Sequence, residues 1–366
     1  MGDKVNVLEG AVKYFLERTL CLRFDICTCV KCRKAMVDYL LAKFPAVYVD
    51  FDNPRFREIE KRVAKDHFRD IFTEINNAIK QVNDHPPHPL DDNKEEAFQD
   101  LLNKIREVRG IDFRRYHASI LKRRIALRLA AHKVKSYTEY LKILANDSGE
   151  YECLFEAMTI NVSEFFRDRY IWVSLRKLIA GVLEANKADK EPVVLWSAGC
   201  ANGEEAYSLA MFCRDVGGPQ AQFKIYATDI DQACLECGRK GVYDAAKIEA
   251  LFKPEFEEAF GFDPRQYFVA DGGRYRIIDD LRALVEFKYL DLTSQDYIAN
   301  VNIVFCRNVF IYFTKGLQEQ ILDKFYKSLR PRGLFVMGEA ESLVSEARVI
   351  FKEINLGGRV YRKIDV

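Results

Sequence analysis

The 366-residue sequence has no apolar run that approaches the ~20 residues needed to cross a bilayer, so we expect no membrane-spanning helix. It also lacks a basic segment followed by an apolar stretch at its start, and no repeat or low-complexity tract interrupts it. Because no secretory signal is predicted, the ten cysteines favour a reducing compartment, and we expect a cytoplasmic location. A formal net charge of only +1 argues against bulk nucleic-acid binding.

The hydrophobic content is 49%, which is enough for packed cores, and the length predicts two or three domains. Residues 1–85 show helical patterns around a cysteine-rich turn and an extended AVYVDF piece, with one long amphipathic helix over about 54–82. The prolines of NDHPPHPLDDNKE disfavour helix and mark residues 86–94 as a linker. We expect a helical domain over 95–165 and a further domain over 166–366.

In the last of these domains, apolar strand patterns alternate with helical ones. The strand candidates are VVLW, FKIYAT, VEFKYL, NIVFCRN and GLFVMG, and their alternation with helices predicts a doubly wound α/β sheet. Between the second and third candidates, residues 241–283 carry a helical stretch and two strand-like runs around Asp271, Gly272 and Gly273. This segment predicts a small inserted subdomain with a hairpin, the alternative being a decorated surface loop.

The first strand and the turn after it, in PVVLWSAGCANGEEAY, form the most informative stretch. Small residues after a buried strand let a ligand approach the backbone closely. The second strand ends at Asp229, where a carboxylate at the carboxyl edge of a sheet can accept both hydroxyls of a ribose. The pattern therefore indicates a nucleoside-binding site.

The charge of this turn selects the nucleoside. A dinucleotide site normally has GxGxxG and no acid, because backbone amides and the helix dipole receive a pyrophosphate. Here Glu204 and Glu205 would repel a pyrophosphate and favour a cation, which fits S-adenosylmethionine, with its sulfonium and ammonium groups. Two alternatives remain: the acids are ordinary first-turn helix residues, or the chain is an NAD-dependent oxidoreductase.

Motifs along the chain resemble those of CheR-type chemotaxis methyltransferases, and the resemblance spans about residue 111 to the end. The motifs are MTINVSEFFRD, WSAGCANGEEAYSLAM, YATDID, YLDL, IVFCRNVFIYF and LRPRGLFVMGEAESL, in the family's order. The resemblance implies a Rossmann-like class I methyltransferase sheet with an inserted small β-subdomain, preceded by an all-α domain. It also implies that the chain transfers methyl groups from S-adenosylmethionine to receptor glutamates.

Site residues of the family can be assigned to this chain at the positions where its motifs match. The resemblance implies cofactor contacts from Asn161, Ser163, Arg167, Ala198, Gly199, Glu204, Asp229, Asp291, Leu292 and Asn308. Asp291 stands where the family usually has Asn, and Ser163 stands where Thr is common, which keeps the hydroxyl.

The implied reaction needs alignment more than proton removal, because a glutamate carboxylate is already ionised at neutral pH. We expect Arg167 and Tyr312 to be the catalytic residues, orienting the attacking oxygen and the carboxylate of the cofactor's methionine part. The alternative is a catalytically silent sensor that binds S-adenosylmethionine or a cyclic dinucleotide without methyl transfer.

A basic segment between Asp112 and Glu139 suggests how a receptor is recognised. Leu121 and Ile125 belong to an apolar stripe, so basic residues fall on another helix face, and we predict that Arg123, Arg124 and Arg128 bind substrate. The expected partner is the acidic helical region of methyl-accepting chemotaxis receptors, with only peripheral association at the membrane. The alternatives are a solvated helix face or, less favoured by the near-neutral charge, nucleic-acid binding. Because the hairpin loop VADGGRYR is shorter than in family members that bind a receptor pentapeptide, we expect no pentapeptide tether.

Residues 5–85 are similar to the late competence protein ComFB, whose relatives include cyclic-dinucleotide binders. We expect this regulatory domain to bind a cyclic dinucleotide, with Arg33 and Lys34 as candidate phosphate contacts, or as ordinary exposed cations. The thiolates of Cys21, Cys27, Cys29 and Cys32 are candidate ligands of a structural zinc. The alternative is that these cysteines are reduced and partly buried.

Overall fold

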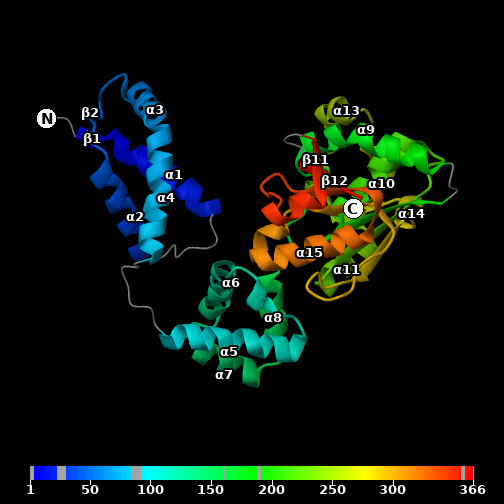
Figure 1. Ribbon diagram of the computed structural model, residues 1–366, viewed down its shortest axis with the longest axis horizontal. Helices are drawn as coiled ribbons and strands as arrows, with labels where there is room; N and C mark the ends of the chain where they lie inside the picture. The colour runs from blue at the N-terminus through cyan, green and yellow to red at the C-terminus, as the bar shows by residue number, and fades with distance from the viewer. Residues whose placement is uncertain are drawn as a thin grey trace. The chain divides into compact units, whose positions relative to one another are not determined.

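The computed structural model describes residues 4–22, 30–84, 92–159, 161–187, 191–355 and 359–365. The chain forms two compact units, one with residues 1–109 and 117–151 and the other with residues 110–116 and 152–366. Figure 1 shows the helices and strands of both. None of the helices in the described ranges is both long enough and apolar enough to cross a membrane.

The first part of the chain is a helical bundle with a short two-stranded sheet. Its elements are β1 (Lys4–Asn6), α1 (Val7–Leu22), α2 (Val30–Lys43), β2 (Tyr48–Asp50), α3 (Phe56–Asp66) and α4 (Phe68–Asp84), and β1 pairs antiparallel with β2. The prediction of one helix over 54–82 is wrong, because the chain leaves helical geometry at His67 (φ −99°, ψ 5°). Helix α4 contributes Ile71, Ile75 and Ile79 to the core at helical spacing, whereas α3 buries none of its residues.

The next part consists of α5 (Asp92–Arg109), α6 (Ala118–Ala131), α7 (Tyr137–Asn146) and α8 (Glu150–Met158). Glu150, only 3% exposed, accepts hydrogen bonds from Arg128 at 2.8 and 2.5 Å and from the Tyr140 hydroxyl. Burial alone would raise the pKa of Glu150, but the hydrogen bonds from Arg128 and Tyr140 lower it to about 2. One carboxylate therefore ties α6 and α7 to the start of α8.

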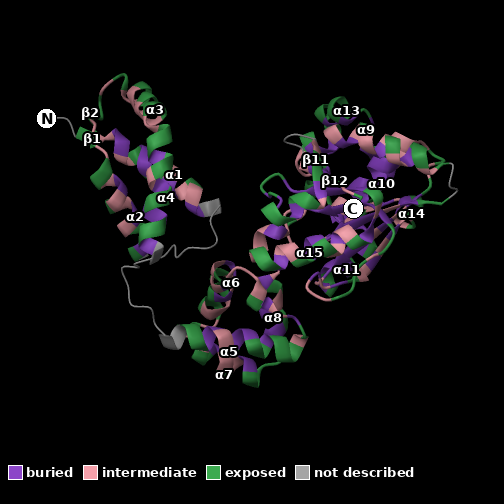
Figure 2. Ribbon diagram, viewed as in Figure 1, coloured by how far each residue is buried: buried purple, intermediate pink, exposed green. Residues whose placement is uncertain are grey.

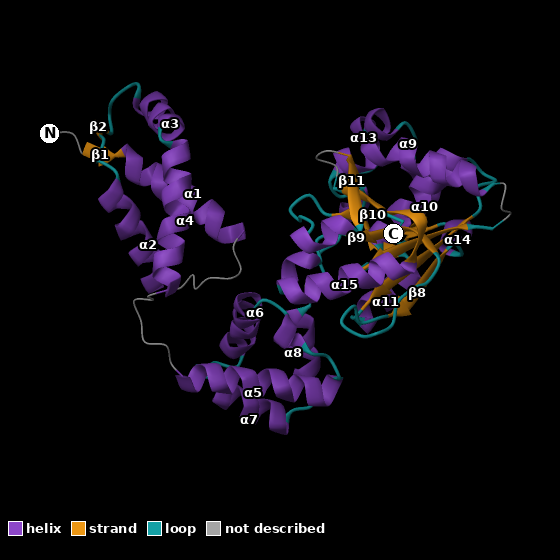
Figure 3. Ribbon diagram, in the orientation of Figure 1, coloured by secondary structure: helices purple, strands orange, loops and turns teal. Residues whose placement is uncertain are grey.

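The second unit is built on a seven-stranded sheet of order β11-β12-β10-β9-β3-β4-β8 (Figure 3). The strands are β3 (Val193–Ala198), β4 (Phe223–Asp229), β8 (Val285–Tyr289), β9 (Val301–Cys306), β10 (Leu329–Met337), β11 (Phe351–Asn355) and β12 (Val360–Lys363). The predicted doubly wound sheet is confirmed, and every strand candidate is a strand. Strands β11 and β12 were not predicted from the sequence, and β12 pairs antiparallel with β10.

Helices cover both faces of this sheet. Helices α9 (Arg169–Asn186), α10 (Glu204–Gly217) and α11 (Gln232–Lys240) share one apolar core with the sheet, and α15 (Lys315–Ser328) shares another. The central strands are the most buried part of the sheet (Figure 2): β9 is buried along its whole length, and β3 at all but one residue. The strand order turns at β3, which pairs in parallel with β4 on one side and β9 on the other. Ligands of such sheets bind outside the carboxyl ends of the strands at this switch point.

The segment between β4 and β8 forms the predicted inserted subdomain. It contains β5 (Val242–Asp244), α12 (Ala245–Ile248), α13 (Pro254–Phe260), β6 (Phe268–Asp271), β7 (Arg274–Ile277) and α14 (Asp279–Arg282), and its sheet order is β5-β7-β6. Gly272 and Gly273 connect β6 to β7 with φ values of 56° and 84°, as a tight hairpin turn requires. Because Tyr243, Phe256 and Phe260 belong to the apolar core of the main sheet, the segment is more than a surface loop.

We predict that the carboxylate of Glu150 stabilises the helical part in a pH-dependent way. Because its folded-state pKa lies below the ordinary value of 4.5, the stabilisation is complete above about pH 4.5 and is lost as the pH falls towards 2. At pH 7, Glu150→Gln should lower the free energy of unfolding of this part by about 3 kcal/mol. This loss should be seen as roughly 100-fold faster amide hydrogen exchange in α6 and α8. Lys142→Ala, which changes an exposed cation of α7, is the matched control. Unchanged exchange in Glu150→Gln would contradict this role.

Candidate active site

The functional side chains follow the carboxyl ends of the parallel strands. Ala198 ends β3 and is fully buried, and Gly199 begins the turn that leads into α10. The backbone N–H groups of Gly199 and Cys200 donate to the carbonyl of Thr228 at 2.8 and 3.0 Å, which holds this turn against β4. At Gly199, with φ of 79°, a Cβ atom would lie 2.6 Å from the side chain of Val309. The turn therefore requires glycine there, for both its backbone conformation and its close packing.

Asp229, at the end of β4, is 8% exposed. Its Oδ2 accepts from the N–H of Ala201 at 2.8 Å, and its Oδ1 accepts from the N–H of Asp231 at 3.0 Å. Burial raises the pKa of Asp229, while these backbone donors act in the opposite direction. A carboxylate has about four acceptor positions, so each oxygen keeps capacity for a ribose hydroxyl.

The segment before α9 meets the end of β4 through Asp231. Asp231 Oδ2 accepts from the Asn161 amide at 2.7 Å and from the Thr159 hydroxyl at 3.2 Å, and its Oδ1 caps α11. Asn161 and Ser163 then line a pocket of about 560 Å³ together with Glu204. The structure thus brings these three predicted cofactor residues into one cavity.

Glu204 and Glu205 have different environments. Glu204 is fully buried; its Oε1 accepts from Lys247 of the inserted subdomain at 2.5 Å, and its Oε2 has no hydrogen-bond partner among the described residues. Glu205 accepts from the Ser197 hydroxyl at 2.7 Å and is paired with Arg307. Burial raises the pKa of Glu205 although Arg307 acts in the opposite direction. Only Glu204 therefore retains an unused oxygen for a cation, which corrects the expectation that both acids serve this purpose.

Arg307, which the sequence analysis did not select, organises this edge of the sheet. Its side chain is 2% exposed; its guanidinium lies 2.7 Å from Asp168 and 3.3 Å from Glu205, and it donates to the backbone carbonyl of Arg167 at 2.9 Å. This bond holds the backbone of Arg167, a predicted catalytic residue, near α10. The positive charge of Arg167 also favours the ionised form of Glu205. A cation directly after a buried strand, in IVFCRN, was the signal available in the sequence.

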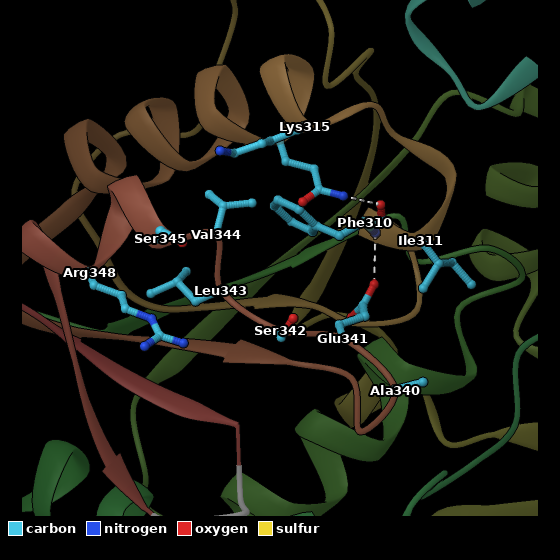
Figure 4. Close-up of a pocket in the computed structure, with 11 residues that line it drawn as sticks. Phe310, Ile311, Lys315, Ala340, Glu341, Ser342, Leu343, Val344, Ser345 and Arg348 are labelled. Atoms are coloured by element: carbon cyan, nitrogen blue, oxygen red, sulfur yellow. Dashed lines mark hydrogen bonds between the residues drawn. The ribbon is translucent and has the colours of Figure 1, made fainter. Parts of the chain in front are cut away.

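The turn after β9 carries Asn308 and Tyr312. Asn308 has φ of 60°, and its N–H donates to Glu341 at 2.8 Å. Glu341, 3% exposed, also accepts from the N–H groups of Phe310 at 2.8 Å and Gly338 at 2.7 Å. Figure 4 shows the bond from Phe310 to Glu341. Burial raises the pKa of Glu341, and these backbone donors counteract that rise. One buried carboxylate thus shapes the turn that carries both predicted residues.

The end of β8 supplies Asp291 and Leu292. Asp291 accepts from the Thr293 backbone at 2.7 Å and from its hydroxyl at 2.8 Å, and Leu292 lies in the apolar core around α15. Tyr116 was not predicted; its ring packs edge-on against Phe313 at 4.9 Å. Burial raises the pKa of Tyr116, and the charges of Asp291 and Asp229 raise it further. The side chain of Tyr116 therefore lies near these two carboxylates.

The predicted receptor-binding arginines all lie on α6, but they do not form one exposed face. Arg123 is exposed, Arg124 is half-buried, and Arg128 forms the ion pair with buried Glu150. The expectation for Arg128 is corrected, because its guanidinium is used to hold α8. The roles of Arg123 and Arg124 stay predictions.

Most of the predicted zinc site lies outside the described residues: Cys27 and Cys29 fall in the segment 23–29, and nothing is described of the Cys21 side chain. Cys32 is fully buried in the core of the N-terminal bundle. Within the described part of the chain, no group of three or more His, Cys, Asp or Glu residues could hold a metal ion. Arg33 pairs with Glu17 at 2.7 Å, and Lys34 is exposed.

Together, the sheet order and the antiparallel strand β12 define the sheet of a Rossmann-like methyltransferase, and the pocket lined by Glu204 lies at the start of the helix that follows β3. Residues 161–357 match the family described as CheR methyltransferase, SAM binding domain, and residues 96–159 match CheR methyltransferase, all-alpha domain. Residues 5–86 match late competence development protein ComFB. The chain belongs to the CheR methyltransferase family and carries an N-terminal ComFB domain.

Curated relatives cover the same region. Chemotaxis protein methyltransferase 2 of Pseudomonas aeruginosa is 32% identical over 274 residues, which is 72% of this chain and 94% of that protein. The chemotaxis protein methyltransferase of Listeria monocytogenes is 34% identical over 239 residues, 65% of this chain and 87% of that protein. The chemotaxis protein methyltransferase of Salmonella typhimurium is 31% identical over 271 residues, which is 72% of this chain and 88% of that protein.

We predict that Arg307→Met destabilises the second unit by about 3–5 kcal/mol, because it leaves Asp168 and Glu205 without their buried cation. The protein's two tryptophans, Trp172 and Trp196, both lie in this unit, so urea unfolding followed by tryptophan fluorescence reports its stability. Arg362→Met, at an exposed arginine of β12, is the control. A midpoint equal to that of the control would show that the ion-pair network contributes little.

Proposed function

We propose that this protein transfers a methyl group from S-adenosylmethionine to glutamate side chains of chemotaxis receptors, giving methyl esters. The observation that carries the proposal is the buried Oε2 of Glu204, which has no hydrogen-bond partner among the described residues and lies in a pocket shared with Asn161 and Ser163, in a chain of the CheR family. An unused carboxylate oxygen beside amide and hydroxyl groups suits the ammonium of S-adenosylmethionine and disfavours a pyrophosphate. The residues present therefore fit this cofactor, and the same argument disfavours an NAD-dependent oxidoreductase.

The cofactor contacts divide among the strand ends. Asp229 would hold the ribose hydroxyls with the acceptor positions that its two backbone bonds leave open. Asp291 and Leu292 would flank the adenine, and Tyr116 adds an aromatic surface beside the same two carboxylates. Asn161, Ser163, Arg167 and Glu204 would hold the methionine end, with Ala198 and Gly199 lining the turn between the two ends.

When bound, S-adenosylmethionine supplies an electrophilic methyl group on a sulfonium. The acceptor carboxylate is ionised at neutral pH, so the protein needs no general base. Arg167 and Tyr312 would orient the attacking oxygen, and Asn308 would support the turn from which Tyr312 projects. Buried apolar residues around this turn, including Phe310 and Phe313, limit the access of water.

Two features extend the proposal to other parts of the chain. Arg123 and Arg124 of α6 would contact the acidic helical region of the receptor, independently of a pentapeptide tether. The ComFB domain would bind a cyclic dinucleotide through Arg33 and Lys34. A zinc ion would be held there by Cys21, Cys27, Cys29 and Cys32. Both parts of this proposal are supported by the family match over residues 5–86. Calorimetry with cyclic dinucleotides and metal analysis of the purified chain test these two points, and the absence of heat or of zinc would refute them separately.

Asp229→Ala should weaken S-adenosylmethionine binding about 10- to 100-fold, because it removes a charge-assisted acceptor for the ribose. Isothermal titration calorimetry measures the effect, and tryptophan fluorescence checks that the variant is folded. Asp271→Ala, at the exposed hairpin tip, is the control and should bind like the wild type. Wild-type affinity in Asp229→Ala would remove the ribose contact from the proposal.

Methyl transfer is tested with labelled S-adenosylmethionine and receptor cytoplasmic domains, and the expected product is a base-labile ester. Tyr312→Phe should lower kcat about 10-fold or more, with the affinity for the cofactor unchanged, because only the hydroxyl that orients the acceptor is lost. Tyr297→Phe, at a partly exposed tyrosine outside the site, is the control. If the wild type binds S-adenosylmethionine but produces no ester, the silent-sensor alternative holds.

A further inference from the structure

A second pocket, of about 450 Å³, opens beside the turn that carries Asn308 and Tyr312 (Figure 4). Its lining comes from the 3₁₀ turn η3 (Phe310–Tyr312), the start of α15, the loop after β10 and the 3₁₀ turn η4 (Ser345–Val349). Phe310 and Ile311 lie in the chain between the two predicted residues. The pocket is therefore built on the same turn as the site proposed for the acceptor.

The polar groups at the base of this pocket are satisfied within the protein. Both oxygens of Glu341 accept from backbone N–H groups, and the Gln318 amide donates to the carbonyls of Phe310 at 2.9 Å and Phe313 at 3.0 Å. These bonds fix the turn and leave the Glu341 carboxylate occupied. The base therefore serves as a rigid support, and ligand recognition falls to the rim.

Of the two cations that line the rim, one has no ion-pair partner among the described residues. Lys315 is paired with Glu346 at 2.6 Å and lies 3.9 Å from Glu319. Arg348 lines the pocket, is exposed, and forms no ion pair with any acidic side chain in the described ranges. The hydroxyl groups of Ser342 and Ser345 lie on the same rim, and Figure 4 shows the Arg348 guanidinium extending toward the Ser342 side.

An exposed guanidinium on the rim of a pocket is suited to a single carboxylate, which it can bind through two parallel hydrogen bonds. The acceptor of this enzyme class is a protein, so the glutamate that receives the methyl group arrives with its neighbours. On a helix, side chains three or four positions apart lie about 5–6 Å from each other at Cβ. A second acidic side chain of the acceptor can thus reach a pocket that adjoins the acceptor site.

We propose that this pocket is an acceptor subsite in which Arg348, with Ser342 and Ser345, binds an aspartate or glutamate one helical turn from the methylated glutamate. The proposal rests on the function proposed above and names the feature of the acceptor that the enzyme selects. A phosphate group fits less well, because the rim offers only one uncompensated cation among the described residues and phosphate carries up to two charges.

The experiment uses the full-length protein and two helical peptides with the same acceptor glutamate, one with Glu and one with Gln a single turn away. For the wild type, kcat/KM should be about 10-fold higher with the Glu peptide, mainly through KM. Arg348→Gln should reduce this preference to twofold or less while methylating the Gln peptide as the wild type does. Arg348→Glu should favour a third peptide with Lys at that position.

Arg362→Gln is the matched control, because it changes an exposed arginine of the same unit outside the pocket, and it should keep the wild-type preference. Calorimetric affinity for S-adenosylmethionine should be the same in all variants. Methylation of both peptides by the wild type without any preference would overturn the subsite and leave the proposed function standing. If the wild type methylates none of the peptides or receptor domains, both proposals fall. Inhibition by inorganic phosphate that disappears in Arg348→Gln would identify the pocket as a phosphate site instead.

Discussion

The site depends on the ion pairs and the hydrogen bond made by the buried side chain of Arg307. From the end of β9 it reaches Asp168 before α9, Glu205 in α10 and the backbone carbonyl of Arg167. Because its side chain is 2% exposed, the guanidinium of Arg307 is desolvated, and its charge is tolerated only through these partners. The segment that carries Asn161 and Ser163 is thereby fixed to the sheet at the point where a cofactor must bind.

Unusual backbone conformations gather around this network. Phe166, Asp168, Ala201 and Asn308 have φ values of 51°, 58°, 46° and 60°. Three of them are held by side chains: the N–H of Phe166 donates to Ser208 at 3.0 Å, that of Ala201 to Asp229, and that of Asn308 to Glu341. Such strain persists only where surrounding contacts over-determine it, and it concentrates at functional sites. Asp229 thus supports its own turn as well as offering acceptor positions for a ribose.

The inserted subdomain contributes to the site as well as to the core. Lys247 of α12 neutralises one oxygen of Glu204 and leaves the other unused, so the charge available to a cofactor depends on a residue far from the glycine turn in sequence. Tyr116 approaches Asp229 and Asp291 from the short segment 110–116, which belongs to the second unit although the helices before and after it belong to the first. Patterns within one motif could not reveal either residue, because both act through long-range contacts.

Local patterns in the chain were enough to predict the α/β sheet, its parallel strands, the hairpin at Gly272 and Gly273, and the motifs of the CheR family. These features follow from local periodicity, from turn chemistry and from residues that lie close together in the chain. The partner of each charge became known only from the folded chain: Glu205 pairs with Arg307, Glu204 pairs with Lys247, and Arg128 pairs with Glu150 instead of forming part of an exposed face. The tertiary structure also decided the break at His67 and the position of β12. The physical reason is that desolvation and ion pairing depend on distance in space, and a linear pattern does not encode which charges become neighbours.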